Sequence, residues 1–337
     1  MSAKTGVLLI QLGTPDSPGV GDVRKYLFEF LNDPRVIDIP WLLRKILVNL
    51  IIVPFRAPKS AKIYKQLWTE NGSPLLIYSE SLKEKLQKKL GDDFEIELAM
   101  RYKNPSLDDV LSRMREKNYG KIVVFPLFPQ YASASTGSAL EKVMEIVKKW
   151  TVIPEIKFIS EFHDDEFYIN TVAARGAKYN INDYDHVLFS YHGLPTRQLN
   201  NVHSKNYKCD MLNCGPISEG NKYCYRAQCF STTKLIADKL NIPSEKYTVS
   251  FQSRLDKKWL EPFSDKIVIQ KAKEGAKKLL VFSPAFVADC LETTIEIGDE
   301  YNILFREHGG EKVQLVESLN DNDDWVNAVE SIIKKNI

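Results

Sequence analysis

The chain has 337 residues, which is long enough for two hydrophobic cores of about 150 residues each. Its 46 basic and 44 acidic residues leave a formal net charge of +2, and 44% of its residues are hydrophobic, as in ordinary globular proteins. This balance of charge argues against nucleic-acid binding, which requires a basic surface for phosphate contacts.

The first residues, Met1–Ile10, lack the long apolar core and the small-residue cleavage site of a secretory leader. No uninterrupted apolar stretch reaches the roughly 18–20 residues that a membrane-spanning helix needs. We therefore expect a cytoplasmic protein, in which cysteine thiols stay reduced and structural disulfides do not form.

Short apolar, β-branched segments alternate along the chain with longer amphipathic segments. The expected strands are Val7–Leu12, Phe94–Ala99, Lys121–Leu127, Glu155–Ile159, His186–Tyr191, Tyr247–Gln252, Lys278–Phe282 and Val313–Val316. The expected helices include Ser81–Leu90, Ser106–Lys117, Ser138–Lys149, Phe230–Leu240, Asp265–Gly275 and Asp324–Lys335. Strands that alternate with helices of about 10–15 residues predict an α/β protein with parallel sheets that are covered by helices on both faces.

The two halves of the chain resemble each other. Val7–Pro15 resembles Val187–Pro195, and Ile122–Pro129 resembles Leu279–Phe286, in the same order and at comparable separation. Each match is a strand that ends in a turn, which any α/β protein could supply once. Two matches in the same order predict a duplicated α/β domain.

We place the boundary between the two expected domains near residue 155. The N-terminal domain covers 1–155 and the C-terminal domain covers 156–319, and the sequence leaves open whether a last helix within 320–337 packs back on the first domain. Ligands of open α/β sheets bind beyond the carboxyl ends of the strands. No strand is followed by a glycine-rich motif that binds nucleotide phosphates, so a dinucleotide enzyme is disfavoured.

His192 follows the apolar segment His186–Tyr191 and precedes a Gly-Leu-Pro turn, so we expect its ring at the carboxyl end of a strand. Histidine exchanges protons near neutral pH, which suits a catalytic base. A histidine that only caps the strand end is the competing interpretation, and position alone favours it.

A row of acidic residues follows the expected strand Lys278–Phe282. Asp289, Glu292, Glu296 and Glu300 would lie within roughly 80° of one face of an ideal helix, at about 100° per residue. A solvated acidic face is the plain interpretation, but such a face normally includes Lys or Arg, and none occurs between 289 and 300. The row therefore indicates carboxylates that relay protons or bind a hard or borderline cation.

Six short motifs are spread over nearly the whole chain. They are Gln11–Pro15, Asn71–Leu75, Leu127–Ser138, Ser190–Pro195, Phe251–Arg254 with Trp259–Pro262, and Asp289–Glu296. Together they resemble the ferrochelatase family, in family order from residue 6 to beyond 315. The resemblance implies two Rossmann-like domains of the class I chelatase type with a porphyrin cleft between them. It also implies a lyase that inserts ferrous iron into a porphyrin, either protoporphyrin IX or coproporphyrin III, in haem biosynthesis.

The resemblance also implies roles for individual residues. His192 would take protons from the pyrrole N–H groups, with Glu292 and Glu296 as further catalytic residues. The implied metal-binding residues are His192, Asp289, Glu292, Glu296 and Glu300, on a helix with a π-type irregularity. The implied porphyrin contacts are Leu12, Arg101, Tyr102, Tyr131 and Trp259. Arg101 has a physical case of its own, because a guanidinium at a strand end suits a carboxylate of the substrate.

Four cysteines, Cys209, Cys214, Cys224 and Cys229, lie within 21 residues in the pattern C-x4-C-x9-C-x4-C. Structural zinc commonly uses closer pairs, whereas a [2Fe–2S] cluster needs four thiolates and accepts wider gaps. Some bacterial proteins that resemble ferrochelatase carry a [2Fe–2S] cluster in such an internal segment, so we expect a cluster here. Zinc and unliganded thiols are the alternatives. Because metal insertion involves no electron transfer, a cluster would be structural or a sensor.

The most apolar segment is Pro40–Arg56, in which Trp41, Arg44, Lys45 and Arg56 would suit a helix at a lipid interface. A core helix above the active site is an equal alternative. Two other functions also compete with a ferrochelatase. A cobaltochelatase acting on an earlier tetrapyrrole would be expected to have a pair of cleft histidines, and a non-catalytic tetrapyrrole or iron–sulfur sensor would need only the cysteine cluster.

Overall fold

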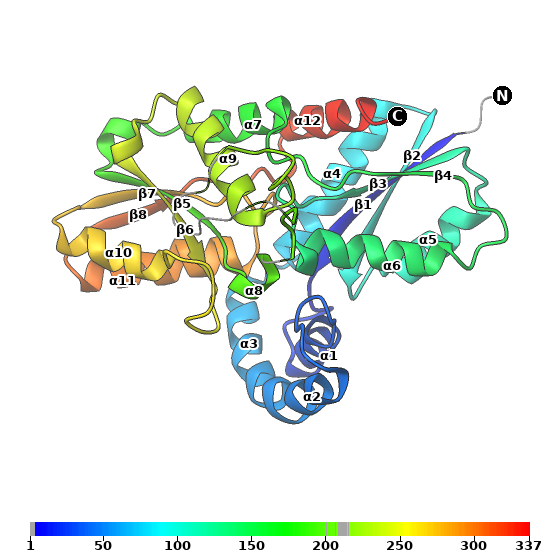
Figure 1. The fold of residues 1–337 in the computed structure, drawn as a ribbon, viewed down its shortest axis with the longest axis horizontal. Coiled ribbons are helices and arrows are strands. Elements are labelled where there is room, and N and C mark those ends of the chain that lie inside the picture. Colours follow the sequence, from blue (N-terminus) through cyan, green and yellow to red (C-terminus); the bar gives the residue numbers. More distant parts are fainter. Residues whose placement is uncertain (1–3, 200, 206, 208–213, 215) are drawn as a thin grey trace. The chain divides into compact units, whose positions relative to one another are not determined.

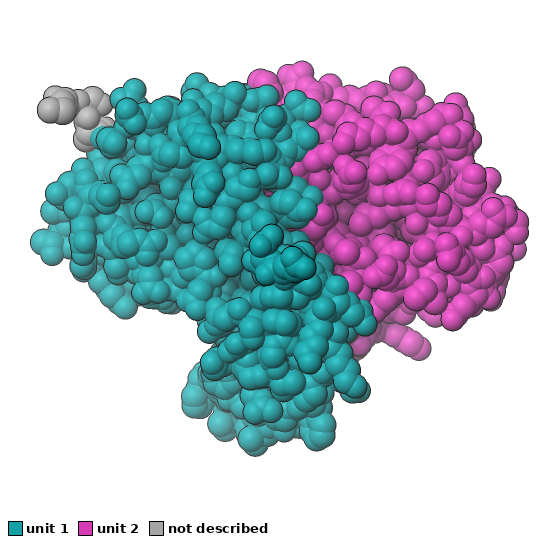
Figure 2. Space-filling model, turned by 180° about the vertical axis from the view of Figure 1, so that it is seen from behind, with its two compact units in different colours: residues 1–128, 132–161, 320–337 teal, residues 129–131, 162–319 magenta. Residues whose placement is uncertain are grey.

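The computed structural model describes residues 4–199, 201–205, 207, 214 and 216–337. Its contacts divide the chain into one unit of residues 1–128, 132–161 and 320–337 and a second unit of residues 129–131 and 162–319 (Figure 2). Each unit contains a four-stranded parallel sheet flanked by helices (Figure 1). The expected α/β class with two Rossmann-like domains is confirmed.

The first unit contains four strands, which are β1 (Thr5–Gly13), β2 (Phe94–Tyr102), β3 (Lys121–Pro126) and β4 (Glu155–Phe158). Its α-helices are α1 (Val20–Leu31), α2 (Trp41–Ile46), α3 (Val53–Leu67), α4 (Pro74–Leu90), α5 (Leu107–Glu116), α6 (Ser138–Val147) and α12 (Asp323–Lys334). Two short π-helices join some of these elements, η1 (Leu47–Ile52) and η2 (Ser133–Gly137).

The second unit contains β5 (His186–His192), β6 (Tyr247–Gln252), β7 (Lys278–Phe282) and β8 (Lys312–Leu315). Its α-helices are α7 (Glu166–Gly176), α8 (Thr196–Leu199), α9 (Tyr225–Lys239), α10 (Ser264–Lys273) and α11 (Asn302–Glu307). It also has two 3-10 turns, η3 (Ile181–Asp183) and η4 (Ser244–Lys246), and a π-helix, η5 (Leu291–Tyr301).

Both sheets have the same strand order. It is β2-β1-β3-β4 in the first unit and β6-β5-β7-β8 in the second, so in each sheet the first strand along the chain lies between the second and the third. This arrangement creates a point where the chain connections leave a central strand in opposite directions, and ligands of open α/β sheets bind at such points. In the second unit that point is the carboxyl end of β5, where His192 lies.

Side chains at the helix termini explain where several helices begin. Ser106 precedes α5, and its hydroxyl accepts a hydrogen bond from the backbone N–H of Asp109. Asn322 caps α12 in the same way by accepting from the N–H of Asp324. α12 packs on α4 of the first unit, where Lys85 of α4 forms an ion pair with Asp323 over 3.2 Å. The last helix therefore belongs to the first unit.

Helices α1, α2 and α3, with η1 between the last two, form a helical lobe next to the sheet of the first unit (Figure 1). Several of its large apolar side chains are exposed rather than packed. Among the described residues, no helix is long and apolar enough to cross a membrane.

Candidate active site

His192 is the last residue of β5, and its side chain is partly exposed. The ring nitrogen Nδ1 lies 2.7 Å from the carbonyl oxygen of Gly193. Because a carbonyl only accepts, Nδ1 must carry the proton of the neutral ring, which leaves the lone pair on Nε2. The rings of Trp259 and Phe286 have centroids 6.3 Å from that of His192. The histidine thus presents a proton-accepting atom close to two aromatic side chains.

A close approach of backbone segments holds the end of β5 in place. Gly193 donates its N–H to the carbonyl of Gln252 over 2.8 Å, and His192 lies opposite Gln252 in the β5–β6 pairing. A Cβ atom on Gly193 would come within 2.8 Å of that carbonyl oxygen and 3.2 Å of the Trp259 ring. Only glycine fits at this position, and its fit places His192 beside the carboxyl end of β6.

The acidic row lies on η5, which follows β7 and is a π-helix rather than the α-helix that the spacing predicts. The π-type irregularity implied by the family resemblance is present, and it extends over all 11 residues of this helix. Runs of this length are rare, and π-helical turns are frequent at functional sites. Glu292 and Glu296 are partly buried, whereas Glu300 is exposed, so the three carboxylates do not share one environment.

Glu296 accepts four hydrogen bonds from three residues. Its Oε1 accepts from the backbone N–H of Ser253 over 3.0 Å and from the hydroxyl of Tyr301 over 3.1 Å. Its Oε2 accepts from the side-chain amide of Gln252 over 3.0 Å and from the hydroxyl of Ser253 over 2.5 Å. The amide of Gln252 also donates to the backbone carbonyl of Glu292 over 2.8 Å. Gln252 therefore connects the strand that pairs with His192 to the acidic helix.

The protein environment raises the pKa of one side chain in the acidic row and of one side chain beside it. Although the Glu300 side chain is exposed overall, partial desolvation of its carboxyl group, together with the carboxylates of Glu296 and Asp299, raises its pKa. Burial raises the pKa of the Cys290 thiol well above its usual range, so this cysteine is a neutral neighbour of the row. At the start of the helix, Thr293 donates its hydroxyl towards Asp289 over 3.5 Å, which places Asp289 in the turn before the row.

In the first unit, Arg101 and Tyr102 end β2 and contact a buried carboxylate that sequence reasoning missed. The Nη2 of Arg101 lies 2.6 Å from Oδ2 of Asp33, and the same oxygen accepts from the hydroxyls of Tyr102 over 2.9 Å and Ser138 over 2.5 Å. Tyr102 is fully buried, so it supports Arg101 from behind and offers no surface to a ligand. Arg101 and Leu12 both retain some exposed surface.

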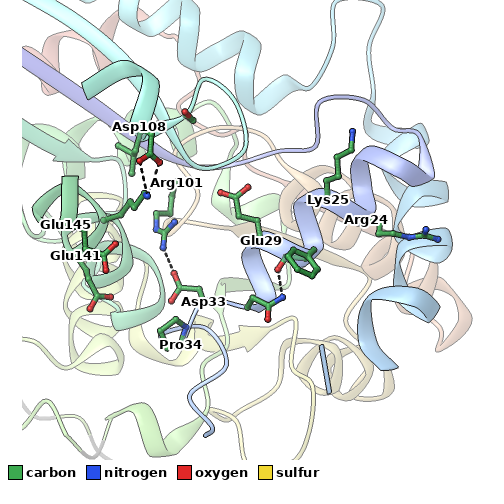
Figure 3. Close-up of a pocket in the computed structure, with 14 residues that line it drawn as sticks. Arg24, Lys25, Glu29, Asp33, Pro34, Arg101, Asp108, Glu141 and Glu145 are labelled. Carbon is green, nitrogen blue, oxygen red and sulfur yellow. Dashed lines mark hydrogen bonds and ion pairs between the residues drawn. The ribbon is translucent and has the colours of Figure 1, made fainter. Parts of the chain in front are cut away.

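Arg101 and Asp33 also border a hollow of about 780 Å³ between α1, α5 and α6 (Figure 3). Charges of both signs line it, and some of them form ion pairs, as Lys142 does with Asp108 over 2.8 Å. A hollow of mixed charge has no clear preference for an anion or a cation. We therefore assign it no ligand.

Tyr131 belongs to the second unit and follows the loop after β3. Its backbone N–H donates to the side-chain carbonyl of Gln228 over 2.6 Å, and its ring lies 5.4 Å from that of Tyr223. Tyr131 and Trp259 are both partly exposed, as residues that contact a flat aromatic ligand must be.

Three of the four clustered cysteines are described, and Cys209 lies outside the described residues. Cys224 is the residue before α9, Cys229 lies within α9, and both are buried. Burial raises the pKa of Cys229 well above its usual range, and the thiols of Cys224 and Cys214 raise it further. Arg226 donates from Nη1 to the sulfur of Cys214 over 2.7 Å. The three described cysteines therefore influence one another at the start of α9, although their sulfur atoms do not all lie within 4.8 Å of one another.

Comparison with known proteins identifies the family. A model of the ferrochelatase family matches residues 4–337. The chain belongs to the ferrochelatase family. The ferrochelatase of Coxiella burnetii (strain Dugway 5J108-111) is 46% identical over 338 residues, which cover 99% of this chain and 94% of that protein. The ferrochelatase of Legionella pneumophila (strain Paris) is 44% identical over 338 residues, covering 99% of this chain and all of that protein.

Solved structures agree with the fold of this ferrochelatase family member. The structure of SirB from Bacillus subtilis with Fe3+ has a TM-score of 0.56 and 12% identity, over 98% of this chain and 95% of that one. The multi-domain protein DR2241 from Deinococcus radiodurans has a TM-score of 0.51 and 10% identity, over 98% of this chain and 55% of that one. At such low identity these likenesses concern the fold alone.

His192 and the acidic row were expected from the sequence of this ferrochelatase family member. The residues that connect them were not. Gln252 and Ser253 belong to one of the six motifs, yet no role followed from the motif itself. No local sequence pattern indicates a role for Tyr301, because its contact with Glu296 depends on the π-helix. Asp33 was hidden in a segment, Asn32-Asp33-Pro34, that is typical of an ordinary turn.

Proposed function

We propose that this protein inserts ferrous iron into a porphyrin in haem biosynthesis, with protoporphyrin IX and coproporphyrin III as the two candidate substrates. The observation that carries the proposal is the link between His192 and the acidic helix through Gln252. His192 lies opposite Gln252 across the β5–β6 pair, and the Gln252 amide donates to Glu296 over 3.0 Å. A proton acceptor and a carboxylate row thus share one end of one sheet in a chain of the ferrochelatase family.

Metal insertion releases two protons from the pyrrole N–H groups while the four nitrogen atoms bind the metal. His192 is suited to take these protons, because the hydrogen bond from Nδ1 to the carbonyl of Gly193 leaves the Nε2 lone pair available. Trp259 and Phe286 beside it provide apolar ring faces of the kind that grip a flat macrocycle. Binding energy along the macrocycle would then be available to distort it for metal entry.

The carboxylates of the acidic row are proposed to handle the metal ion and the released protons. We infer that Glu292 and Glu296, which are partly buried, act together with His192, with Glu300 at the exposed end of the row and Asp289 before the helix. Carboxylate oxygens bind divalent cations and also carry protons, so the row can deliver ferrous iron or lead protons away. The raised pKa of Glu300 favours proton exchange at the exposed end.

Four further side chains are proposed to contact the porphyrin. Leu12, Arg101, Tyr131 and Trp259 each retain exposed surface near the carboxyl end of a strand. The guanidinium of Arg101 suits a substrate carboxylate, although its Nη2 already pairs with Asp33. Tyr102, the fifth residue of this group by resemblance, is fully buried and is proposed only to hold Arg101 in place.

The test is metal insertion by the purified protein, with ferrous iron under anaerobic conditions or with zinc, followed by the absorbance and fluorescence of the porphyrin. We expect wild-type activity and a loss of about 10²- to 10⁴-fold in kcat for His192→Ala. His308→Ala is the matched control, because His308 lies at the end of α11 in the same unit and bonds only to a helix carbonyl among the contacts described. An inactive wild type, or full activity in His192→Ala, would overturn the proposal.

We also propose that the cysteine segment holds a [2Fe–2S] cluster through Cys209, Cys214, Cys224 and Cys229. Three observations on the described thiols support it. They lie close enough together to raise the pKa of Cys229, two of them are buried, and Arg226 donates to the sulfur of Cys214. A cluster would neutralise the buried thiolates and tie this segment to α9, and it would take no electron in metal insertion.

The absorption spectrum of anaerobically purified protein separates the three alternatives for this segment. A cluster gives visible charge-transfer bands together with about two iron atoms per chain, whereas zinc gives metal without colour. The variant Cys229→Ser should lose the bands, and Cys290→Ser, which changes the cysteine beside the acidic row, should retain them. A colourless, iron-free protein that is prepared without air would overturn the cluster.

Finally, we propose that the helical lobe of the first unit rests on an anionic lipid surface. Trp41, Leu50 and Phe55 are 63%, 68% and 73% exposed, and the remaining members of this apolar face are Phe28, Leu42, Leu43, Ile46 and Ile51. A core helix would bury these side chains. Arg56 is exposed beside them, but Arg44, expected at the interface, is buried and donates to the carbonyl of Ile39 over 3.1 Å. Apolar side chains with basic neighbours are typical of peripheral membrane binding.

Flotation with vesicles that contain anionic lipid tests the apolar face. We expect the wild type to float at low salt and the double variant Leu50→Glu/Phe55→Glu to remain at the bottom with an unchanged melting temperature. Ile153→Glu, an exposed apolar residue elsewhere in the first unit, should float like the wild type. Failure of the wild type to float at low salt would contradict this part of the proposal, and self-association in gel filtration would then identify a second copy as the partner.

A further inference from the structure

Ser253, the residue after β6, has a backbone conformation that is unusual for its type. Its φ angle is +60°, in the left-handed region that favours glycine. In this conformation the backbone N–H and the hydroxyl of the same residue both reach Glu296, one on each carboxylate oxygen, over 3.0 Å and 2.5 Å. One residue thus contributes two of the four hydrogen bonds that the carboxylate accepts.

Glycine would adopt this conformation without steric cost, but it would supply only the N–H. Strained backbone conformations of this kind cluster at functional sites, where the surrounding structure holds them. The serine at this position therefore costs some backbone stability, but it supplies a second hydrogen-bond donor to Glu296.

Gln252 adds a third hydrogen bond with a fixed orientation. Its Nε2 donates to Glu296 and to the carbonyl of Glu292, while its Oε1 accepts from the hydroxyl of Ser190 over 2.6 Å. The hydroxyl of Ser264 lies 2.8 Å from that of Ser190 and extends the chain into the core. A flip would turn the amide oxygen towards the Glu296 carboxylate and the Glu292 carbonyl, which can only accept, so these two acceptors determine that Nε2 faces them.

Tyr301 completes the set from the far end of the π-helix. Its hydroxyl donates to Oε1 of Glu296 over 3.1 Å. A phenol is protonated near neutral pH, so the Tyr301 hydroxyl can donate to this oxygen. Both oxygens of Glu296 therefore receive two donors each.

We propose that Ser253, Gln252 and Tyr301 are positioning residues that hold the Glu296 carboxylate rigidly in the geometry that metal insertion requires. This inference rests on the proposed function, and it assigns a different part to Glu296 than to Glu300, which is exposed at the end of the row. A carboxylate with four donors does not rotate to follow a cation. The four donors occupy its lone-pair sites and hold its negative charge in one fixed place and orientation, and such preorganisation is where catalytic sites gain most.

Two substitutions of Ser253 separate positioning from stability. Ser253→Gly removes the hydroxyl and relieves the left-handed backbone, whereas Ser253→Ala removes the hydroxyl and retains the strain. We expect both to lower kcat for zinc or iron insertion by a similar factor, about 10- to 100-fold, as the loss of outer-shell partners of metal ligands typically does. The KM for porphyrin and the porphyrin Kd from fluorescence titration should stay at the wild-type value. The melting temperature of Ser253→Gly should equal or exceed that of the wild type and should exceed that of Ser253→Ala.

The matched control is Asn241→Gly. Asn241 also has a positive φ, +53°, and it is exposed just beyond α9 in the same unit. We expect wild-type kcat for this variant, which shows that a glycine in a left-handed position does not by itself impair the enzyme.

The outcomes distinguish this inference from the proposed function. If the wild type inserts metal and Ser253→Gly retains full kcat, the positioning role is wrong while the proposed function stands. A loss of activity in Ser253→Ala alone, in proportion to a lower melting temperature, would also contradict positioning. If the wild type inserts no metal, the proposed function fails and the inference fails with it.

Discussion

The hydroxyl of Tyr301 lies 3.1 Å from Oε1 of Glu296, although the two residues are five positions apart on one helix. At about 100° per residue, two side chains at this spacing on an α-helix would point in directions about 140° apart. Leu291–Tyr301 is a π-helix, in which hydrogen bonds join residues five apart and bring their side chains onto one face. The π-helix thus converts a distant tyrosine into a partner of the carboxylate.

The variant Tyr301→Phe should lower kcat about tenfold without changing the porphyrin Kd, because it removes one of four donors to Glu296 and leaves the aromatic ring in place. Steady-state assays and a fluorescence titration measure the two quantities. Tyr119→Phe, a buried tyrosine of the first unit, is the control and should retain activity. Equal activity in both variants would show that the phenol of Tyr301 is dispensable.

Gly193→Ala should reduce both stability and activity. The added methyl group would come within 2.8 Å of the carbonyl oxygen of Gln252, so the end of β5 must shift and carry His192 with it. We expect a loss of about 1–3 kcal/mol in the free energy of unfolding, as for other overpacked positions. Gly275→Ala tests whether any new methyl group is harmful, since nothing lies within 4 Å of its Cβ, although its φ of +97° adds backbone strain. Wild-type activity in Gly193→Ala would contradict the close approach.

Removal of Asp33 should destabilise the first unit strongly. The carboxylate is buried and pairs with Arg101 over 2.6 Å, so Asp33→Ala leaves a guanidinium without its counter-charge. We expect a cost of about 3–5 kcal/mol in urea unfolding. Glu141→Ala breaks the more exposed pair with Arg35 and should cost less than about 1 kcal/mol. Similar costs for the two variants would argue against a special role of the buried pair.

His186 should make the second unit sensitive to acid. Burial and the nearby Lys271 lower its pKa from 6.5 to about 4, and its Nε2 lies 2.9 Å from the hydroxyl of Thr248. The unfolded chain therefore binds this proton at a higher pH than the folded chain does. The stabilisation is complete above pH 6.5 and is lost as the pH falls towards 4.

The free energy of unfolding, measured by urea titration at about pH 7 and about pH 5, checks the role of His186. The decrease between these values should be smaller in His186→Gln, which keeps a polar group near Thr248 but does not titrate. His308→Gln should behave like the wild type. An unchanged decrease in His186→Gln would assign the acid sensitivity to other groups.

Much of the fold followed from the sequence because its signals are local. Each of the eight expected strands lies within a few residues of an observed one, and the strand ends at His192 and Gln252 differ from the expected ends by one residue at most. The repeated strand-and-turn segments also matched the shared strand order of the two sheets. Apolar runs and turn motifs consist of residues that are adjacent in the sequence, so they can be identified without knowledge of the tertiary structure.

The errors and omissions arise where distant segments meet. The apolar segment Pro40–Arg56 could be a core helix or an interfacial helix by its pattern alone, and only the packing shows Leu50 exposed and Arg44 buried. Residue spacing alone predicts a regular helix for the acidic row, because it does not distinguish an α-helix from a π-helix over 11 residues, and the π-type irregularity was implied only by the family resemblance. Asp33 pairs with Arg101, which lies 68 positions later in the chain, and no local sequence pattern predicts this contact.

By itself, the sequence determined the α/β class, the positions of the strands, and the placement of His192 and the carboxylate row at strand ends, because strand periodicity and turn chemistry depend on adjacent residues. Only the tertiary structure decided which carboxylate is anchored. Glu296 meets Ser253 and Gln252 because β6 ends beside the π-helix, and it meets Tyr301 because that helix brings residues five apart together. These contacts depend on backbone geometry over distant segments, which residue types and spacing do not encode.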